Sequence, residues 1–489
     1  MRFPVIIVLL FSMMLGPSCS KDRGPYVTAL LGESITNFDP VELSEYSYLT
    51  LFSQTCGRLT SVDEALNIVG DLATSWDISN DYTTYTFNLD TKRKFHAGES
   101  FSSDDILFTF ERLMALRGEN SAAYSSDLGQ IKVDGQDKIV INLKKKNPRF
   151  LYLLSHPAYC VLSKKRPFVG VGSFKIPNSN GAYLISRVEN GNLFMKANDT
   201  YDKEIIENEI VVKFMPQDEA VKEFKQGKIH DLSFYLLNKN EVEDLRSVSK
   251  VIKSKIYWSW VVQLNPRKEI FSSENRRRLL VQSFDKKTFY NQWGVGLASG
   301  NSVIPEGLFG HLREAEIKKF KASREKFPCN ETLKVSIING LPSQKNIEKA
   351  FHNQISKITG CDVQINSLDM GKWVKSQGAS DAHFYVFGLD PNSTDPLGYY
   401  RYFIKGSTIE NTNGYDDSEL NNLFTKLYQM PFRQRSQIDY MNMHNAFYRT
   451  GFGLILGYPQ FDFLYNKSVT QSHMNPLGMH LNKWYMIGR

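Results

Sequence analysis

The sequence predicts a mixed α/β fold with more than one domain. Residues 84–89 alternate apolar and polar side chains, the two-residue period of a strand with one buried face. Residues 102–114 show apolar residues at helical spacing after a capping serine. Residues 333–365 contain a strand pattern, a helix pattern and a second strand pattern. A chain of 489 residues is too long for one compact core, so we expect two or three subdomains.

The strand predicted at 84–89 lies between two turns. Ser79, Asn80 and Asp81 form the turn before it, and residues 96–98 form the turn after it. The apolar face of the strand consists of Tyr85, Phe87 and Leu89.

The helix that follows begins at Ser102 or Ser103, because either side chain can cap the first turn. Asp104 and Asp105 lie in that first turn, where the helix dipole favours negative charge. The apolar stripe of this helix consists of Ile106, Phe110, Leu113 and Met114.

The N-terminus has the pattern of a secretory signal peptide over residues 1–18. Arg2 precedes an apolar run at 5–15, which is too short to span a membrane, since a span needs about 20 apolar residues. Residues 15–19 resemble a bacterial lipobox, in which Cys19 becomes the acylated first residue of the mature protein. The leucine lies one place further from Cys19 than usual and a proline intervenes, so ordinary cleavage is the alternative.

Four more cysteines follow, Cys56, Cys160, Cys329 and Cys361, and an even number permits two disulfides in an oxidising compartment. Cys329 and Cys361 each precede a predicted strand of the 333–365 unit. In a right-handed crossover these strand starts lie at the same sheet edge, which makes a Cys329–Cys361 bridge plausible. Two free buried thiols are the alternative, because spacing alone does not fix connectivity.

The charge pattern argues against a nucleic-acid-binding protein. The net charge is +7, but 59 basic residues are scattered among 52 acidic ones. The short clusters at 144–146 and 276–278 are typical of solvated faces, and a secreted protein meets no DNA. There is no GxSxG, HExxH or CxxC motif and the nine histidines are dispersed. We therefore expect no enzyme activity, no metal site and no cofactor.

The region from 71 to 113 carries a family resemblance. It resembles the family 5 extracytoplasmic solute-binding proteins, the peptide- and nickel-binding components of bacterial ABC importers. The matching positions are Leu72-Ala73, Ser75-Trp76, Asp81, Tyr85-Thr86-Phe87, Lys94-Phe95-His96, Gly98, Asp104, Phe108 and Arg112. The resemblance extends over most of the mature chain, including 180–185, where alanine replaces the usual proline at Ala182.

The resemblance implies a periplasmic-binding-protein-like α/β fold, in which two lobes close about a hinge and three domains contain mixed sheets flanked by helices. Two strands that cross between the lobes are expected to form the hinge, at 261–265 and 456–461. The domain boundaries carried over are 26–55 plus 170–265 plus 460–489 for domain I, 56–169 for the inserted domain II, and 266–459 for domain III.

The loop at 388–396, after the strand-like residues 382–387, resembles the Asp-rich ligand loop of this family. In peptide-binding members an aspartate there pairs with the α-ammonium group of the ligand, a charge-assisted hydrogen bond. Asp390 matches that position best and Asp395 second. Aspartate and asparagine before proline also form turns by bonding their own backbone, which is the structural alternative.

The aromatic strand at 257–265 supplies three more ligand-binding candidates, Tyr257, Trp258 and Trp260. Alternation places Tyr257 on one face and the two tryptophans on the other, so only one set faces the ligand. We expect core packing for the set with the tryptophans.

These observations lead to one functional hypothesis. The chain is an extracytoplasmic receptor, in the periplasm or at the cell surface and anchored through Cys19, that captures an oligopeptide and delivers it to an ABC permease with its ATPase. We expect a monomer. A receptor for a nickel chelate, an opine, an oligosaccharide or a cell-wall peptide is the first alternative. A non-transport lipoprotein or secreted hydrolase on the same fold is the second.

Overall fold

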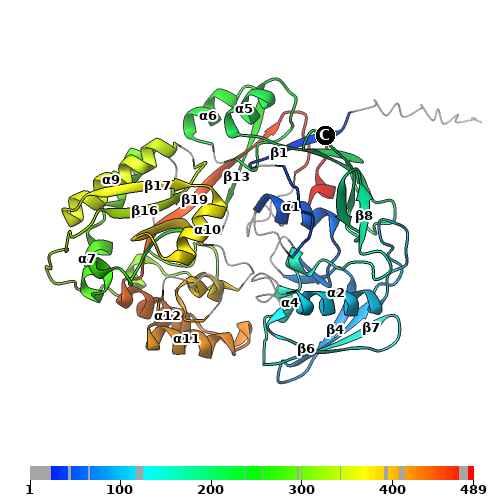
Figure 1. The fold of residues 1–489 in the computed structure, drawn as a ribbon, viewed down its shortest axis with the longest axis horizontal. Coiled ribbons are helices and arrows are strands. Elements are labelled where there is room, and N and C mark those ends of the chain that lie inside the picture. The colour runs from blue at the N-terminus through cyan, green and yellow to red at the C-terminus, as the bar shows by residue number, and fades with distance from the viewer. Residues whose placement is uncertain are drawn as a thin grey trace, which may run out of the picture.

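Figure 1 shows the computed structural model, in which each of three bodies contains one of the three larger sheets. Two further sheets of two strands each, β2-β3 and β8-β9, lie in the described part of the chain. The signal-peptide region, Cys19 and Asp390 lie outside the described residues. The structure describes residues 24–32, 34–41, 46–63, 67–116, 125–235, 237–255, 257–294, 297–298, 300–341, 343–389, 395–406, 414–472 and 483–489.

Body I contains a four-stranded sheet of order β1-β12-β11-β10. Strand β1 is parallel to β12, and the other pairs are antiparallel. Because β1 pairs with a strand about 180 residues later, this body is built from separate parts of the chain. Its elements are β1 (Tyr26–Leu30), α1 (Tyr46–Thr55), β8 (Phe168–Val171), β9 (Phe174–Pro177), β10 (Tyr183–Glu189), β11 (Asn192–Ala197), β12 (Glu209–Phe214), α5 (Gln217–Lys225) and α6 (Lys239–Leu245).

Body II contains an antiparallel sheet of order β4-β5-β7-β6 with helix α2 against it. The predicted strand at 84–89 is confirmed as β5, with every second side chain buried. Ser102 is the N-cap residue of α2, one of the two positions predicted, and the Asp105 carboxylate accepts its backbone N–H at 2.9 Å. The elements are β2 (Thr60–Val62), β3 (Ile68–Gly70), β4 (Ala73–Ile78), β5 (Thr84–Leu89), α2 (Ser103–Ala115), β6 (Leu128–Val133), β7 (Lys138–Leu143) and α4 (Phe150–Leu153).

Body III contains a seven-stranded mixed sheet of order β13-β19-β14-β18-β16-β17, with β15 on β19. The predicted strand–helix–strand unit is confirmed as β16, α9 and β17, whose strands are parallel. The strands are β13 (Ser249–Lys255), β14 (Ser259–Leu264), β15 (Leu297–Ala298), β16 (Leu333–Ile338), β17 (Val363–Leu368), β18 (Phe384–Leu389) and β19 (Gly453–Asn466). The helices are α7 (Glu274–Ser283), α8 (Lys286–Trp293), α9 (Gln344–Thr359), α10 (Met370–Ala379), α11 (Ser418–Tyr428), α12 (Gln437–Thr450) and the 3₁₀ helix η4 (Pro396–Phe403).

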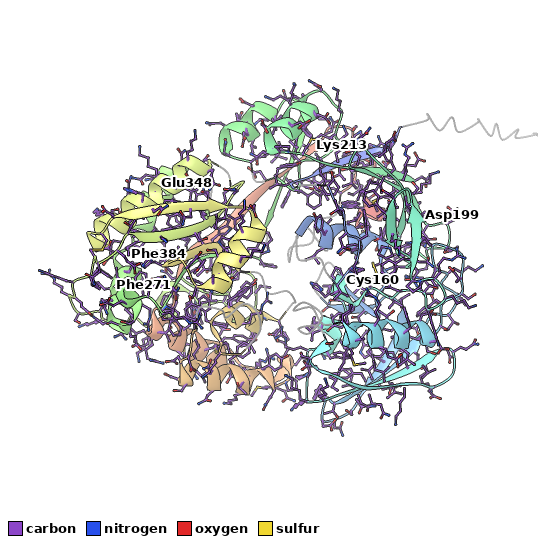
Figure 2. All side chains as sticks on the ribbon, viewed as in Figure 1. Cys160, Asp199, Lys213, Phe271, Glu348 and Phe384 are labelled. Atoms are coloured by element: carbon purple, nitrogen blue, oxygen red, sulfur yellow. A yellow bond between two sulfur atoms is a disulfide. The ribbon has the colours of Figure 1, made fainter. Side chains whose placement is uncertain are left out.

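The sheet of body III is buried on both faces. Val261 and Phe387 belong to one apolar cluster, whereas Val262 and Phe384 belong to the cluster on the other face. In Figure 2, Phe384 and Phe271 lie in this body, and their rings meet edge to face at 4.9 Å. Cys160 lies on the opposite side of the molecule. Bodies I and II have separate cores.

Strand β19 carries the chain between bodies. Its first residues, up to Gly457, pair with β14, and its later residues, from Gln460, pair with β13. The hinge expectation at 261–265 stays a prediction. Residues 261–264 lie inside β14 and pair with β18 on one side and with β19 on the other over most of their length. Strand β19 changes its partner from β14 to β13 at 457–460. The second hinge expectation, at 456–461, overlaps this change of partner and stays a prediction.

Two disulfides are present among the described residues. One joins Cys329 to Cys361, the pair considered from the sequence, with Cα atoms 5.2 Å apart. The other joins Cys56 to Cys160 across 104 residues. No helix in the described part of the chain has the length and apolar character needed to cross a membrane.

Helix α12 contains a histidine whose burial creates a pH dependence. His444 is fully buried, and its Nδ1 lies 3.0 Å from the Tyr400 hydroxyl. Burial lowers the pKa of His444 from its ordinary value of 6.5 to about 3. The imidazole is therefore neutral in the folded protein at neutral pH.

We predict that His444 makes the fold less stable as the pH falls. Between about pH 6.5 and 3 the unfolded chain binds a proton here that the native state excludes, so the free energy of unfolding decreases by about 1.4 kcal/mol per pH unit. His444→Gln should show a shallower decrease from pH 7 to 4.5 in urea denaturation. The same substitution at exposed His352 is the control. Equal slopes for wild type and His444→Gln would contradict the prediction.

Candidate functional site

The predicted ligand loop connects β18 to η4. Strand β18 is central in body III, between β14 and β16, so the loop begins from a buried strand. Residues 390–394 lie outside the described part of the chain, and Asp390 is among them. The structure therefore describes the two ends of the loop, Leu389 and Asp395. Asp395 caps η4, because its Oδ1 accepts the N–H of Leu397 at 2.9 Å.

The Asp395 carboxylate is bound by two arginines. Its side chain is 1% exposed, and Oδ1 lies 2.7 Å from Nη1 of Arg435, whose side chain is 0% exposed. Oδ2 lies 2.9 Å from Nε of Arg149. Burial acts to raise the pKa of Asp395, but Arg149 and Arg435 offset it and hold the pKa below its ordinary value. The carboxylate is thus ionised and already neutralised by the protein, which leaves Asp390 as the candidate for a ligand ammonium group.

Arg435 is itself fixed by its surroundings. It donates to the Met430 carbonyl through Nε at 3.1 Å and Nη2 at 2.9 Å, and its Nη1 lies 3.2 Å from the Tyr440 hydroxyl. No sequence pattern indicated either arginine, because they lie 40 and 246 residues from Asp395. No spacing pattern in a single sequence connects positions so far apart.

Two of the three aromatic candidates lie at the ligand loop. The Tyr257 carbonyl accepts the Tyr399 hydroxyl at 2.5 Å, and Tyr399 belongs to η4, directly after the loop. The Trp258 ring lies beside the backbone of Gly388, where a Cβ would be 3.6 Å from it. Gly388 is in β18, just before the loop. The Tyr257 backbone carbonyl and the Trp258 ring therefore contact the segments on the two sides of residues 390–394, whereas the Tyr257 ring lies beside Gly307.

Trp260 has a different position. It is 5% exposed, and its ring packs against Trp293 with 5.4 Å between ring centroids. It belongs to the same core cluster as Val262, as expected for the set with the tryptophans, whereas Trp258 of that set is only partly buried and packs against a different cluster. Its burial argues against direct ligand contact.

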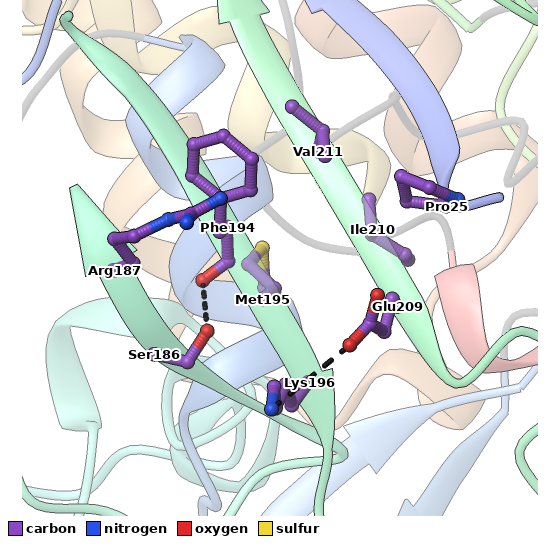
Figure 3. Close-up of a pocket in the computed structure, with 9 residues that line it drawn as sticks. All are labelled: Pro25, Ser186, Arg187, Phe194, Met195, Lys196, Glu209, Ile210 and Val211. Carbon is purple, nitrogen blue, oxygen red and sulfur yellow. Dashed lines mark hydrogen bonds and ion pairs between the residues drawn. The ribbon is translucent and has the colours of Figure 1, made fainter. Parts of the chain in front are cut away.

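One hollow lies away from the ligand loop. Figure 3 shows it over β10, β11 and β12 of body I, with a volume of about 320 Å³. Arg187 covers the ring of Phe194 at 3.8 Å, and Lys196 faces Glu209. Its polar groups thus contact one another, and it belongs to a different sheet from the loop after β18. The lining residues are Pro25, Ser186, Arg187, Phe194, Met195, Lys196, Glu209, Ile210 and Val211.

A metal site is not apparent in the described ranges, where no three His, Cys, Asp or Glu side chains are grouped to hold an ion.

A family match decides the assignment of the chain. The family described as bacterial extracellular solute-binding proteins, family 5 Middle, matches residues 67–411, which is 345 of 489 residues. The chain belongs to this family. The resemblance identified from residues 71–113 is thereby confirmed.

Curated relatives of this family 5 protein align over most of its length. The dipeptide-binding protein DppE of Bacillus subtilis (strain 168) is 22% identical over 400 residues, 72% of each chain. The probable D,D-dipeptide-binding periplasmic protein DdpA of Escherichia coli (strain K12) is 22% identical over 441 residues, which covers 84% of this chain and 83% of that protein.

Solved structures confirm the predicted fold class. The periplasmic binding protein DppA from Helicobacter pylori, in complex with the peptide STSA, superposes with a TM-score of 0.79 at 19% identity, covering 95% of this chain and 98% of that one. AppA from Bacillus subtilis, in complex with a nonapeptide, gives 0.79 at 16% identity. NikZ from Campylobacter jejuni, in complex with Ni(L-His), gives 0.77 at 20% identity. For AppA and NikZ the match covers 95% of this chain and 99% of theirs. At these identities the likeness concerns the fold alone.

We predict that Asp395→Asn destabilises this family 5 protein. The substitution leaves the fully buried Arg435 guanidinium without a charged partner, which costs about 3–5 kcal/mol when one member of a buried pair is removed. Urea denaturation measures the loss. Asp362→Asn, at an exposed position of the same body, should change the free energy of unfolding by less than about 0.5 kcal/mol. If the two variants were equally stable, the assigned role of Asp395 would be wrong.

Proposed function

We propose that this solute-binding protein captures oligopeptides between its lobes and delivers them to an ABC import permease with its ATPase. The observation that carries the choice of ligand is the set of relatives that align over most of the chain. Two are named for dipeptides, and two of the structures with the same fold hold peptides.

The ligand loop supplies the chemistry of recognition. The Asp390 carboxylate pairs with the α-ammonium group and sets the register of the peptide, since a charge-assisted hydrogen bond is both strong and directional. Tyr257 and Trp258 flank the loop and form part of the wall around the first ligand residues. Extended backbone of the ligand adds to strand edges, which gives affinity that is independent of the side chains.

Capture requires closure of the lobes. The ligand shifts the protein to the closed state only if it binds that state more tightly than the open one. The peptide is released unchanged to the permease, and the ATP-driven step belongs to the partner.

The protein acts outside the cytoplasm as a monomer. The signal peptide at 1–18 directs export, and acylation of Cys19 anchors the mature chain to a membrane. Two disulfides support this location, because such bonds persist in oxidising compartments.

Mass spectrometry of the purified mature protein tests the choice of ligand. We expect native spectra with one ligand per protein, and denaturing spectra with a ladder of short-peptide masses. After unfolding, washing and refolding, the protein should bind again from a synthetic peptide mixture. A single non-peptide mass, such as a nickel chelate or an opine, would overturn the peptide assignment. Failure to retain any peptide from the mixture would overturn it as well.

A double-mutant cycle on the ligand tests Asp390. Asp390→Asn should weaken binding of a peptide with a free N-terminus by about 2–5 kcal/mol, because the ammonium group is left buried without its charged partner. The N-acetylated peptide should bind weakly to the wild type and no worse to the variant. Isothermal titration calorimetry measures both, with Asp362→Asn as the control. Equal affinity of wild type and Asp390→Asn for the free peptide would exclude the ammonium contact.

A further inference from the structure

Arg149 belongs to body II. It directly precedes α4, whose Phe150 packs edge to face on Tyr85 of β5 at 5.0 Å in the core of that body. Its backbone N–H donates to Asn147 Oδ1 at 2.9 Å. Asn147 in turn donates to Asp127 at 2.7 Å. The backbone position of Arg149 is therefore fixed by its own body.

The side chain of Arg149 reaches into body III. Its Nε lies 2.9 Å from Asp395 Oδ2, and its guanidinium lies 5.3 Å from the ring centroid of Tyr428 in α11. The Nε–Oδ2 contact has the geometry of an ion pair and not of an aligned hydrogen bond. The Arg149 side chain is 11% exposed. Figure 1 shows α4 and α11 facing one another where bodies II and III approach.

Among the described residues, the Asp395 carboxylate pairs with one arginine from each side of this junction. Arg435 and Asp395 both belong to body III, so separation of the bodies leaves their 2.7 Å contact and the cap on η4 intact. Arg149 instead moves into water with body II. Opening therefore breaks one ion pair without leaving a bare buried charge, which would be far more costly. The arrangement suits a contact that forms and breaks repeatedly.

We propose that Arg149 is a latch between the lobes: it binds Asp395 and the Tyr428 ring in the closed state, and it stabilises closure without contacting the ligand. The proposal rests on the proposed function, in which closure captures the ligand. Asp395 lies at the C-terminal end of the loop that contains Asp390, so the latch holds body II against that end of the ligand loop. Because the latch acts on the closed fraction, it changes the affinity for every ligand by the same factor.

The charges around the latch keep it formed over a wide pH range. From body II, Arg149, Asp127 and Lys145 face the junction, and Lys145 pairs with Asp127 at 3.1 Å. From body III, Asp395, Arg435, Tyr428 and Tyr440 face it. The lowered pKa of Asp395 keeps its carboxylate ionised through neutral and mildly acidic solution. The latch should fail only as the pH falls below the ordinary aspartate range, about 4.

The test uses Arg149→Gln in the mature, disulfide-bonded protein. Spin labels on the exposed positions 132 of β6 and 426 of α11 report the distance between bodies II and III. Without ligand, the variant should show a larger population at long distance than the wild type. The affinity for two peptides of different sequence should fall about three- to tenfold by one common factor, mainly through faster dissociation. Arg149→Lys should lose less affinity than Arg149→Gln, since lysine keeps the positive charge but lacks the planar guanidinium.

The control is Arg166→Gln, which removes an exposed arginine of the same body that pairs with Glu99. It should match the wild type in distance and affinity. Unchanged distances and affinities in Arg149→Gln would overturn the latch. Factors that differ between the two peptides would also overturn it, because they indicate direct ligand contact. Urea denaturation of Arg149→Gln and Arg149→Lys identifies a general loss of folding. The distance measurement needs no ligand, so the latch and the peptide assignment can fail independently.

Discussion

The arrangement of the molecule depends on the backbone pairing of strand β19. Its first part is hydrogen-bonded to β14 and its later part to β13. This one strand therefore connects β14 to β13 within the seven-stranded sheet. Isolated bridges from Asp231 to Thr28 and to Tyr465 connect the later part to the sheet of body I. Strand β14 separates β19 from β18, whose end begins the ligand loop. The loop is therefore one strand away from the segment that joins the bodies.

The features that could be predicted from the sequence are those that depend on neighbours along the chain. The alternation in β5, the cap of α2 and the β16–α9–β17 unit each follow from residues within one short segment. The Cys329–Cys361 pair falls in the same class, because a right-handed crossover brings nearby strand starts together. Trp260 shows that alternation along a strand does not by itself predict ligand contact. In a strand buried on both faces, period two separates the faces but does not say which one meets a ligand.

The candidate site could be predicted only in part. The loop at 388–396 was located by resemblance, and Tyr257 and Trp258 do contact the segments at its ends. The role of Asp395 could not be predicted, because it depends on the ion pairs of its carboxylate with Arg149 and Arg435. These arginines come close to Asp395 only in the folded chain. A similar sharing occurs elsewhere: Arg93 of body II pairs with Asp71 of the same body and with Asp202 of body I, at 3.0 Å each. Ion pairs thus connect body II to both of its neighbours.

The Cys56–Cys160 disulfide has a topological consequence for the whole molecule. It closes a covalent ring between cysteines 104 positions apart, and this ring contains the sheet of body II. A path along covalent bonds from one terminus to the other can pass through this bond and omit everything between the two cysteines. A single break in the backbone of body II would leave the chain in one piece, and tension between the termini would bypass that body altogether. Reduction would restore the longer path and place body II directly in the line of force.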